Sequence, residues 1–298
     1  MSDEPVGETP AGRGVHFDRA AAADPGAAAT LSVRGRKPRA QQQARARAVR
    51  VLLTQLALVV AFLGVWEYGV TTGVINAFLF GSPSGIWTFL VKGIRDGSIF
   101  HDMLVTSEET LLGFILGNAI GATVGLALWY SPFFERVFSP FILALGSIPI
   151  IALAPLVIVW AGTDLTSKVL MSTLSVVVVA LLAAFEGARN TDPLEINLLY
   201  SMGATKRQVF RMVVVPSSLT YIFSGLKLTV GFALIGAIIG EFVSSSEGLG
   251  HAIFIAGNLY NIPKVFASLL ATIAIALVFV TVVGRIEKLL LPWRKLTT

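Results

Sequence analysis

Six runs of about 20 apolar residues dominate this sequence, and they constrain its fold more than any other feature. A helix of that length crosses the roughly 30 Å hydrocarbon core of a bilayer. The runs lie near residues 51–70, 104–129, 138–160, 169–185, 224–242 and 265–289. We therefore expect an all-α, polytopic membrane protein with about six transmembrane helices.

The composition supports the same class. Hydrophobic residues make up 54% and charged residues 14% of the 298 residues, and the mean hydropathy is +0.75. A soluble domain of this length does not show such values. The sequence has no cysteine, which excludes disulfides and thiolate chemistry, and its three histidines (His16, His101 and His251) are widely spaced. We therefore expect no metal site.

The first 48 residues differ in composition from the rest of the chain. They are rich in Ala, Gly, Pro, Arg and Gln and lack apolar periodicity, which predicts a disordered tail before a transmembrane domain at residues 49–298. The first apolar run is too long for the core of a signal peptide, so none is expected. The basic stretch at residues 34–50 could contact nucleic acid, but beside a span we favour attraction to anionic lipid and a role in topology.

The distribution of basic residues predicts the orientation. Nine of the 23 Lys and Arg residues lie in the first 50 residues, before the first span. Placing the tail in the cytoplasm puts nine further basic residues inside and four outside, with Lys227 within a span. This excess follows the positive-inside rule. We expect a multi-pass protein of the cell inner membrane with both termini, and the loop at residues 187–216, in the cytoplasm.

A short helix is predicted at the start of that loop. Asp192 can cap it, with Pro193 at the first helical position, where a missing N–H costs nothing. Glu195 is placed to complete a capping box. Gly203 suits the left-handed residue that ends many helices.

A second short helix is predicted after this glycine. Thr205 and Gln208 repeat the capping pattern at its start. At helical spacing, Val209, Met212 and Val213 fall on one face. Three basic residues are expected to point outward: Lys206, Arg207 and Arg211. The segment therefore predicts a docking element for a partner outside the bilayer.

This arrangement resembles the cytoplasmic coupling loop, or EAA motif, of permease subunits in binding-protein-dependent ABC importers. Gly203 and Pro216 have the family's separation, and Pro216 marks the entry to the next long helix. The sequence departs from the family at residues 197–199, where Asn-Leu-Leu stands in place of Glu-Ala-Ala. The resemblance implies that an ATPase contacts Asp192, Glu195, Asn197, Leu198, Leu199, Gly203, Ala204, Thr205, Arg207 and Pro216.

The similarity extends from about residue 82 to residue 291. The stretches GSIPIIALAPLVIVWAG, ARNTDP, SGLKLTVG and GEFVSSSEGLG are similar to the nitrate, sulfonate and taurine importer branch. The resemblance implies a type I ABC importer permease fold, a homodimer, cytoplasmic ATPase subunits that bind ATP, and an extracytoplasmic solute-binding protein. The implied cargo is a small sulfonate, taurine or nitrate-like solute, and the alternative is a heterocyclic vitamin precursor.

The second apolar run carries glycines at every fourth position, namely Gly113, Gly117, Gly121 and Gly125. This spacing keeps them on one helical face. Helices in bilayers associate through such small residues, because their backbones can then approach closely. The pattern predicts a packing face in preference to a pore lining.

Two prolines and two charged residues are candidates for functional roles within the spans. Pro149 and Pro155 should distort the third run and free backbone carbonyls, which makes them candidates for the substrate path. Glu241 either lines the outer end of that path or caps nearby amides. Lys227 either extends to the interface or acts as a gate. Three further acids are expected at outer helix ends: Glu67, Glu108 and Glu109.

The segment at residues 76–102 is amphipathic. Four apolar residues share one helical face: Ile86, Phe89, Leu90 and Ile94. Lys92, Arg95 and Asp96 do not lie on that face. We expect a helix that rests on the outer membrane surface or against the bundle.

The sequence argues against catalysis by this chain. It contains no Walker-type phosphate loop and no clustered catalytic constellation, so we expect a transporter subunit that binds no cofactor and relies on ATP held by a partner. The expected mechanism is alternating access driven by the partner ATPases. An ion-coupled secondary transporter is the rival, and it predicts inverted repeats and charges near span centres. A membrane-bound enzyme is a third interpretation.

Overall fold

The computed structural model describes residues 37–291, and every regular element in that range is helical. The elements are α1 (Lys37–Thr71), α2 (Ala77–Phe80), α3 (Pro83–Asp96), α4 (Ser98–Leu128), α5 (Pro132–Gly146), α6 (Ile150–Ala161), α7 (Leu165–Arg189), α8 (Pro193–Ser201), α9 (Lys206–Val209), the π-helix η1 (Phe210–Val214), α10 (Val215–Ser244), α11 (Leu249–Asn258) and α12 (Ile262–Leu290). The predicted all-α class is confirmed. The chain divides into two compact units, residues 1–62 and residues 63–298.

The described part of the first unit is residues 37–62 of α1, and the last turns of this helix belong to the second unit. The segment of α1 at residues 47–71 is long and apolar enough to cross a membrane. The helix begins at Lys37, within the stretch for which a disordered tail was expected, because Ala, Gln and Arg at residues 40–48 favour helix and extend the span. The rest of the predicted tail, residues 1–36, lies outside the described residues.

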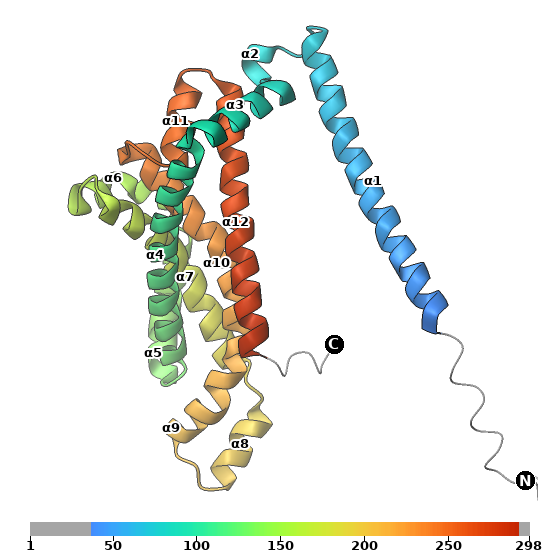
Figure 1. Cartoon of the computed structure of the whole chain (residues 1–298). Coiled ribbons are helices and arrows are strands. Elements are labelled where there is room, and N and C mark those ends of the chain that lie inside the picture. The colour runs from blue at the N-terminus through green and yellow to red at the C-terminus, as the bar shows by residue number, and fades with distance from the viewer. Residues whose placement is uncertain (1–36, 292–298) are drawn as a thin grey trace, which may run out of the picture. The chain divides into compact units, whose positions relative to one another are not determined.

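In the second unit, α4, α7, α10 and α12 run along one another (Figure 1). Helix α7 packs against both α4 and α10. One end of the unit carries α2, α3 and α11, and the other carries α8 and α9 (Figure 1). Five helices of the described chain meet the length and hydropathy of a membrane span, and the pair α5 and α6 makes a sixth if it counts as one broken span.

The glycines of α4 form the predicted packing face. A Cβ atom on Gly117 would lie 2.6 Å from Cβ of Val176, and one on Gly121 would lie 2.7 Å from Cβ of Ala180. Both neighbours belong to α7. Because real Cβ atoms do not approach so closely, only glycine permits this distance between the two helices.

Glycines also allow α10 to pack closely on α7, which the sequence analysis did not anticipate. A Cβ on Gly225 would lie 2.6 Å from Cβ of Ala183, and one on Gly236 would lie 2.6 Å from Cα of Ser172. Helix α7 therefore packs against two glycine-bearing helices. Small residues, and not large apolar ones, determine how closely the central spans pack.

The third apolar run does not form one continuous helix. Helices α5 and α6 meet at an angle of 95°. Pro149 stands at the break as the N-cap of α6, and Pro155 lies inside α6. A proline disfavours helical conformation in the residue before it and cannot donate to the helical ladder, so the chain turns at Pro149. The expected distortion is confirmed, and it divides the run at residues 138–160 between two helices.

Helix α3 has the amphipathic form that the sequence predicts. The Ser82 hydroxyl caps its start by accepting from the amide of Gly85 at 3.1 Å. Ile86 is buried, whereas Ile94 is exposed, so the packed face is narrower than expected. Glu67 of α1 accepts from the amide and the hydroxyl of Ser84, at 3.0 and 2.8 Å. Its carboxylate therefore holds the first turn of α3.

Candidate functional site

The docking element, residues 192–216, comprises α8, α9 and η1 and leads directly into α10. Its first helix begins as predicted, with the amide of Leu194 donating to Oδ1 of Asp192 at 2.8 Å and Pro193 in the first turn. The expected capping box is not formed, because in the described chain Glu195 makes no return bond to the amide of Asp192. The single side-chain bond still satisfies one free amide of the helix start.

Gly203 ends α8 in the predicted manner. Its φ is +82°, which is the left-handed region that glycine adopts without strain. The amide of Gly203 donates to the carbonyl of Tyr200 at 3.0 Å, and the amide of Ala204 donates to the carbonyl of Leu199, also at 3.0 Å. These bonds close the helix end, and the chain can then reverse into α9.

The second helix starts with the capping box that the sequence predicts. Oε1 of Gln208 accepts from the amide of Thr205 at 2.8 Å, and the hydroxyl of Thr205 accepts from the amide of Gln208 at 3.4 Å. Arg207 is exposed beside this cap. The cap fixes where α9 begins, and α9 and η1 carry the chain into α10.

The apolar face of the second helix differs from the prediction. Val209 and Val213 are buried as expected, but Met212 is 66% exposed and Val214 is buried in its place. The cause is the π geometry of η1, in which the amide of Val215 donates to the carbonyl five residues earlier. One extra residue per turn shifts the helical phase, so a prediction at α-helical spacing places the wrong side chain inside.

Lys206 attaches the docking element to the end of α4. Its ammonium donates to the carbonyl of Tyr130 at 2.7 Å and lies 5.8 Å from the ring centroid of Trp129. The Phe210 ring lies 5.6 Å from Trp129 and 5.4 Å from Tyr130. Lys206 therefore does not simply point outward, as was predicted, because its ammonium contacts the two residues that follow α4. The aromatic pair after α4 is a contact that the sequence analysis missed.

A stripe of exposed apolar side chains runs along α8. Leu194, Leu198 and Met202 are 76%, 60% and 78% exposed, and their spacing by four places them on one side of the helix. We call these three residues the α8 stripe. Exposed large side chains grouped on one face are typical of a contact surface for another protein.

The residues at the expected Glu-Ala-Ala position divide between two faces. Asn197 and Leu198 are exposed, whereas Leu199 is half-buried. Leu199 and Ala204 pack against a buried cluster of Ala188, Val209 and Val214. Position 199 therefore helps to hold the docking element on the bundle, and the side chain at position 198 points away from the bundle. Pro216 lies in the first turn of α10, as expected.

At the other end of the unit, Glu241 of α10 is completely buried. Its carboxylate accepts from the hydroxyl of Thr106 at 2.6 Å and from the amide of Gly250. The same hydroxyl accepts from the amide of Leu249 at 2.9 Å. These bonds join α4, α10 and the start of α11. They support the amide-capping alternative for Glu241, and its role in lining a path stays a prediction.

The glycines near residue 250 make this arrangement possible. A Cβ on Gly250 would lie 2.6 Å from Oε2 of Glu241, and Gly248 has a φ of +98°. Lys168 of α7 is buried nearby and donates to the carbonyls of Ser244, at 3.1 Å, and Thr163. The GEFVSSSEGLG motif therefore marks a polar cluster in the sequence. It supplies both the buried carboxylate of Glu241 and the glycines whose backbone lies against it.

One expectation for charged residues in the spans needs correction, because Glu109 is buried beside Glu241, whereas its neighbour Glu108 is exposed. The two alternatives for Lys227 stay predictions. The structure adds that its ammonium forms an ion pair with Glu287 of α12. An opposite charge within reach offsets the cost of placing either group in hydrocarbon. The pair joins α10 to α12.

The proposed path residues are not gathered into one site in this chain. Pro149 and Pro155 are exposed, whereas Glu241 is enclosed. Helix α6 packs against Met171 of α7 through Ala154 and Val157. The contribution of the two prolines to a substrate path stays a prediction. No cluster of three or more His, Asp or Glu side chains that could hold a metal occurs in residues 37–291.

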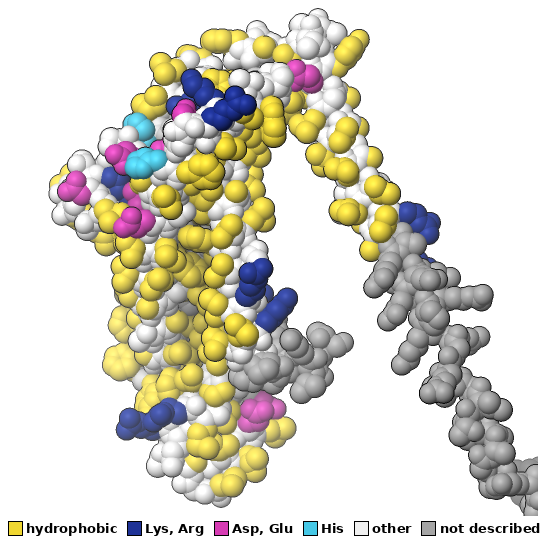
Figure 2. Space-filling model, viewed as in Figure 1, with side chains coloured by type: hydrophobic (Ala, Val, Ile, Leu, Met, Phe, Trp, Pro, Cys, Tyr) yellow, Lys and Arg dark blue, Asp and Glu magenta, His cyan; other side chains and the backbone are white. Residues whose placement is uncertain are grey.

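The surface of the second unit has the polarity of a membrane protein. Hydrophobic side chains cover its long middle part, and most charged side chains lie toward its two ends (Figure 2). One charged end contains α8 and α9 of the docking element, and the other contains α3 and α11 (Figures 1 and 2). This distribution and the apolar helices identify a multi-pass membrane protein.

Comparisons with known proteins agree. The profile of the binding-protein-dependent transport system inner membrane component matches residues 117–296. The riboflavin transport system permease protein RibX of Chloroflexus aurantiacus is 32% identical over 228 residues, which cover 76% of this chain and 85% of RibX. The formylaminopyrimidine transport permease protein ThiX of Halalkalibacterium halodurans is 33% identical over 231 residues, or 78% of this chain and 92% of ThiX.

A more distant relative and a solved structure complete the comparison. The putative aliphatic sulfonates transport permease protein SsuC of Bacillus subtilis is 27% identical, with 80% of this chain and 87% of SsuC covered. A chain of the MetNI methionine ABC transporter in an inward-facing crystal form has the same fold, with a TM-score of 0.59, 20% identity, and coverage of 65% of this chain and 96% of that one. The chain therefore belongs to the family of binding-protein-dependent transport system inner membrane components, the permease subunits of ABC importers.

Proposed function

We propose that this chain forms the membrane pathway of an ATP-driven importer as one of two identical permease subunits. The docking element would receive a cytoplasmic ATPase, and the opposite end would receive an extracytoplasmic solute-binding protein. The main support for this proposal is the α8 stripe, which exposes apolar side chains beyond the ends of the spans. The helix that bears it is capped at both ends, so the position of the stripe is well defined. A peripheral subunit that covered it would remove that surface from water.

The connections of the docking element suggest how motion would reach the spans. The element η1 continues into α10 without a break, and α10 packs closely on α7 and forms an ion pair with α12. A push on the docking element would therefore move these helices together. In the proposed mechanism, closure of the ATPases switches the pathway between outward and inward openings, and the chain itself hydrolyses nothing.

For the cargo, we favour an aromatic heterocycle of the vitamin or vitamin-precursor class. Among the relatives above 30% identity, one is named for riboflavin transport and one for formylaminopyrimidine transport, and a third has a name without a substrate. The relative named for sulfonates is 27% identical. The sulfonate-like cargo expected from the sequence has the weaker support. The pathway itself need not discriminate strongly if the binding protein selects the solute.

Reconstitution would test both the class of transporter and the cargo. Proteoliposomes would contain the permease, its ATPase and the binding protein, with riboflavin, a formylaminopyrimidine or taurine supplied outside. We expect ATP-dependent accumulation of a heterocycle and none with an ATPase variant that cannot hydrolyse ATP. Accumulation driven by an ion gradient without ATP would instead establish the secondary transporter, and ATP-dependent uptake of taurine alone would move the cargo to the sulfonate class.

The proposed orientation predicts a labelling pattern. Because the chain has no cysteine, single cysteines at Met202 and Ser246, which are both exposed, can be labelled selectively. In intact cells that express the permease alone, an impermeant maleimide should label the cysteine at 246 and should label the cysteine at 202 only after the membrane is opened. Labelling of position 202 in intact cells would place the docking element outside and refute the orientation.

A further inference from the structure

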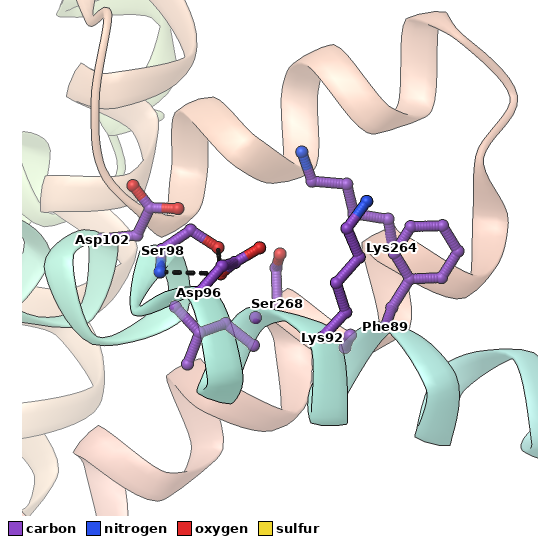
Figure 3. A pocket seen from close by; sticks show the side chains of 10 residues that line it. Phe89, Lys92, Asp96, Ser98, Asp102, Lys264 and Ser268 are labelled. Carbon is purple, nitrogen blue, oxygen red and sulfur yellow. Dashed lines mark hydrogen bonds between the residues drawn. The ribbon is translucent and has the colours of Figure 1, made fainter.

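A pocket lies between α3, the start of α4 and the start of α12, at the end of the unit opposite the docking element (Figures 1 and 3). None of the functions assigned above uses it. Its polar lining consists chiefly of Lys92, Asp96, Ser98, Asp102, Lys264 and Ser268. Phe89 forms one apolar side. Two ammonium groups and two carboxylates therefore share a small space.

The cationic side of the pocket is formed by Lys92 and Lys264. Figure 3 shows both side chains extending in the same direction, next to the ring of Phe89. Within residues 37–291 neither ammonium has a hydrogen bond or an ion pair to the protein. Two unpaired cations at one place are suited to an anionic oxygen ligand, since each retains donors for charge-assisted hydrogen bonds.

The anionic side is formed by Asp96 and Asp102. Oδ1 of Asp96 accepts from the amide and the hydroxyl of Ser98, at 3.0 and 2.7 Å, and the hydrogen bonds from Ser98 hold the pKa of Asp96 below its usual range. Oδ1 of Asp102 accepts from the amide of Gly248 at 3.2 Å. These bonds hold both carboxyl groups in place. In the described chain the second oxygen of each has no donor, so each can accept one from a ligand.

A serine hydroxyl lies between the two sides. Ser268 of α12 is 3% exposed, and Figure 3 shows its hydroxyl directed into the pocket. No other described residue forms a hydrogen bond with this hydroxyl. It is therefore open to the pocket and can donate a hydrogen bond to a ligand there.

The surroundings of the pocket indicate a lipid. Lys264 lies in the first turn of α12, so the pocket stands where the hydrocarbon of the bilayer begins. The helices that form it also carry exposed apolar side chains, namely Trp87 and Ile94 on α3 and Phe100 and Leu104 on α4. Aromatic and basic residues at this level are typical of the interface between headgroups and acyl chains.

We propose that this pocket binds the headgroup of a phospholipid that carries a primary ammonium, such as phosphatidylethanolamine. The phosphate would lie between Lys92 and Lys264, with the hydroxyl of Ser268 as a further donor. The ammonium would donate to the free oxygens of Asp96 and Asp102. A headgroup of this kind matches both charged sides, whereas an anion alone would leave the carboxylates unpaired. The bound lipid would join α3 to α12.

The measurement is retention of lipid by the purified full chain, with phosphatidylethanolamine and phosphatidylcholine of identical acyl chains as probes in native mass spectrometry. The choline headgroup carries the same phosphate but no N–H donor. We expect preferential retention of phosphatidylethanolamine. The double substitution Lys92→Ala and Lys264→Ala should weaken binding of this lipid on the order of tenfold or more, because charge-assisted bonds to phosphate are lost.

Two variants separate this site from nonspecific attraction. Arg285→Ala with Lys288→Ala removes the same charge from exposed positions at the other end of α12 and should leave lipid preference unchanged. Asp96→Asn should reduce the preference for ethanolamine over choline while phosphate binding persists. Equal retention of the two lipids by the natural chain would overturn the proposal. Loss of affinity for the binding protein in the lysine variant, with lipid preference intact, would assign the pocket to a protein contact and overturn it too.

Discussion

Replacing both Gly117 and Gly121 by leucine is expected to abolish the folded helix bundle. A Cβ on Gly121 would already lie 2.7 Å from Cβ of Ala180 and 2.8 Å from the amide nitrogen of Leu181, before the rest of the leucine side chain is added. Neither neighbour can move without the backbone of α7. Overpacking costs about 1 to 3 kcal/mol per site where the surroundings can yield, and here they cannot, so we expect a larger loss.

The measurement is the melting temperature and size-exclusion profile of the detergent-purified variant. Gly231→Leu is the matched control, since this glycine also lies in a spanning helix but has nothing within 4 Å of its ideal Cβ. The control should retain the natural profile, because its side chain would meet lipid or detergent. A double variant as stable as the control would show that α4 and α7 do not approach as closely as the structure indicates.

The features that could be predicted from the sequence are those set by neighbouring residues. The α10 and α12 spans follow from the length of apolar runs, and the caps at Asp192 and Thr205 follow from side chains that bond to amides two or three residues away. The left-handed Gly203 is equally local. The glycine spacing in α4 predicts a packing face because periodicity alone places these residues on one side.

The features that could not be predicted depend on what lies across the fold. The glycines of α4 do not reveal that α7 is their partner, nor that glycines of α10 also pack closely on α7. Lys227 acquires its partner only because Glu287 lies on a helix about 60 residues later. Glu109 and Glu241 are far apart in sequence, so a polar cluster that encloses both could not be read from either.

Two differences between the predicted and observed helices have a local cause, which a prediction from regular α-helical spacing leaves out. The π geometry of η1 moves Met212 outward and Val214 inward, because the register of the helix changes by one residue just before Pro216. The break at Pro149 turns one apolar run into two helices. In both places a proline stands at or next to the change. Where a proline interrupts an apolar run, α-helical spacing should not be carried across it.

Replacing Leu198 by aspartate is expected to remove the partner ATPase from the complex. Leu198 is at the centre of the α8 stripe and is 60% exposed, so the permease loses little packing of its own. In the proposed complex, however, the side chain would be covered by the ATPase. A charge in such a place would be desolvated without a partner, and truncation of a central apolar contact alone often costs about 2 kcal/mol or more. Binding should weaken about thirtyfold or further.

Co-purification of the ATPase and stimulation of its activity by the reconstituted permease would measure this effect, with the melting temperature of the isolated permease as the test of folding. Asn197→Asp is the matched control, because it adds the same charge at the neighbouring exposed position without removing an apolar side chain from the stripe. We expect the control to retain the ATPase and Leu198→Asp to lose it, while both permeases melt at the natural temperature. If Leu198→Asp bound the ATPase normally, the α8 stripe would not be the contact, and the ATPase would have to bind through another surface of the docking element.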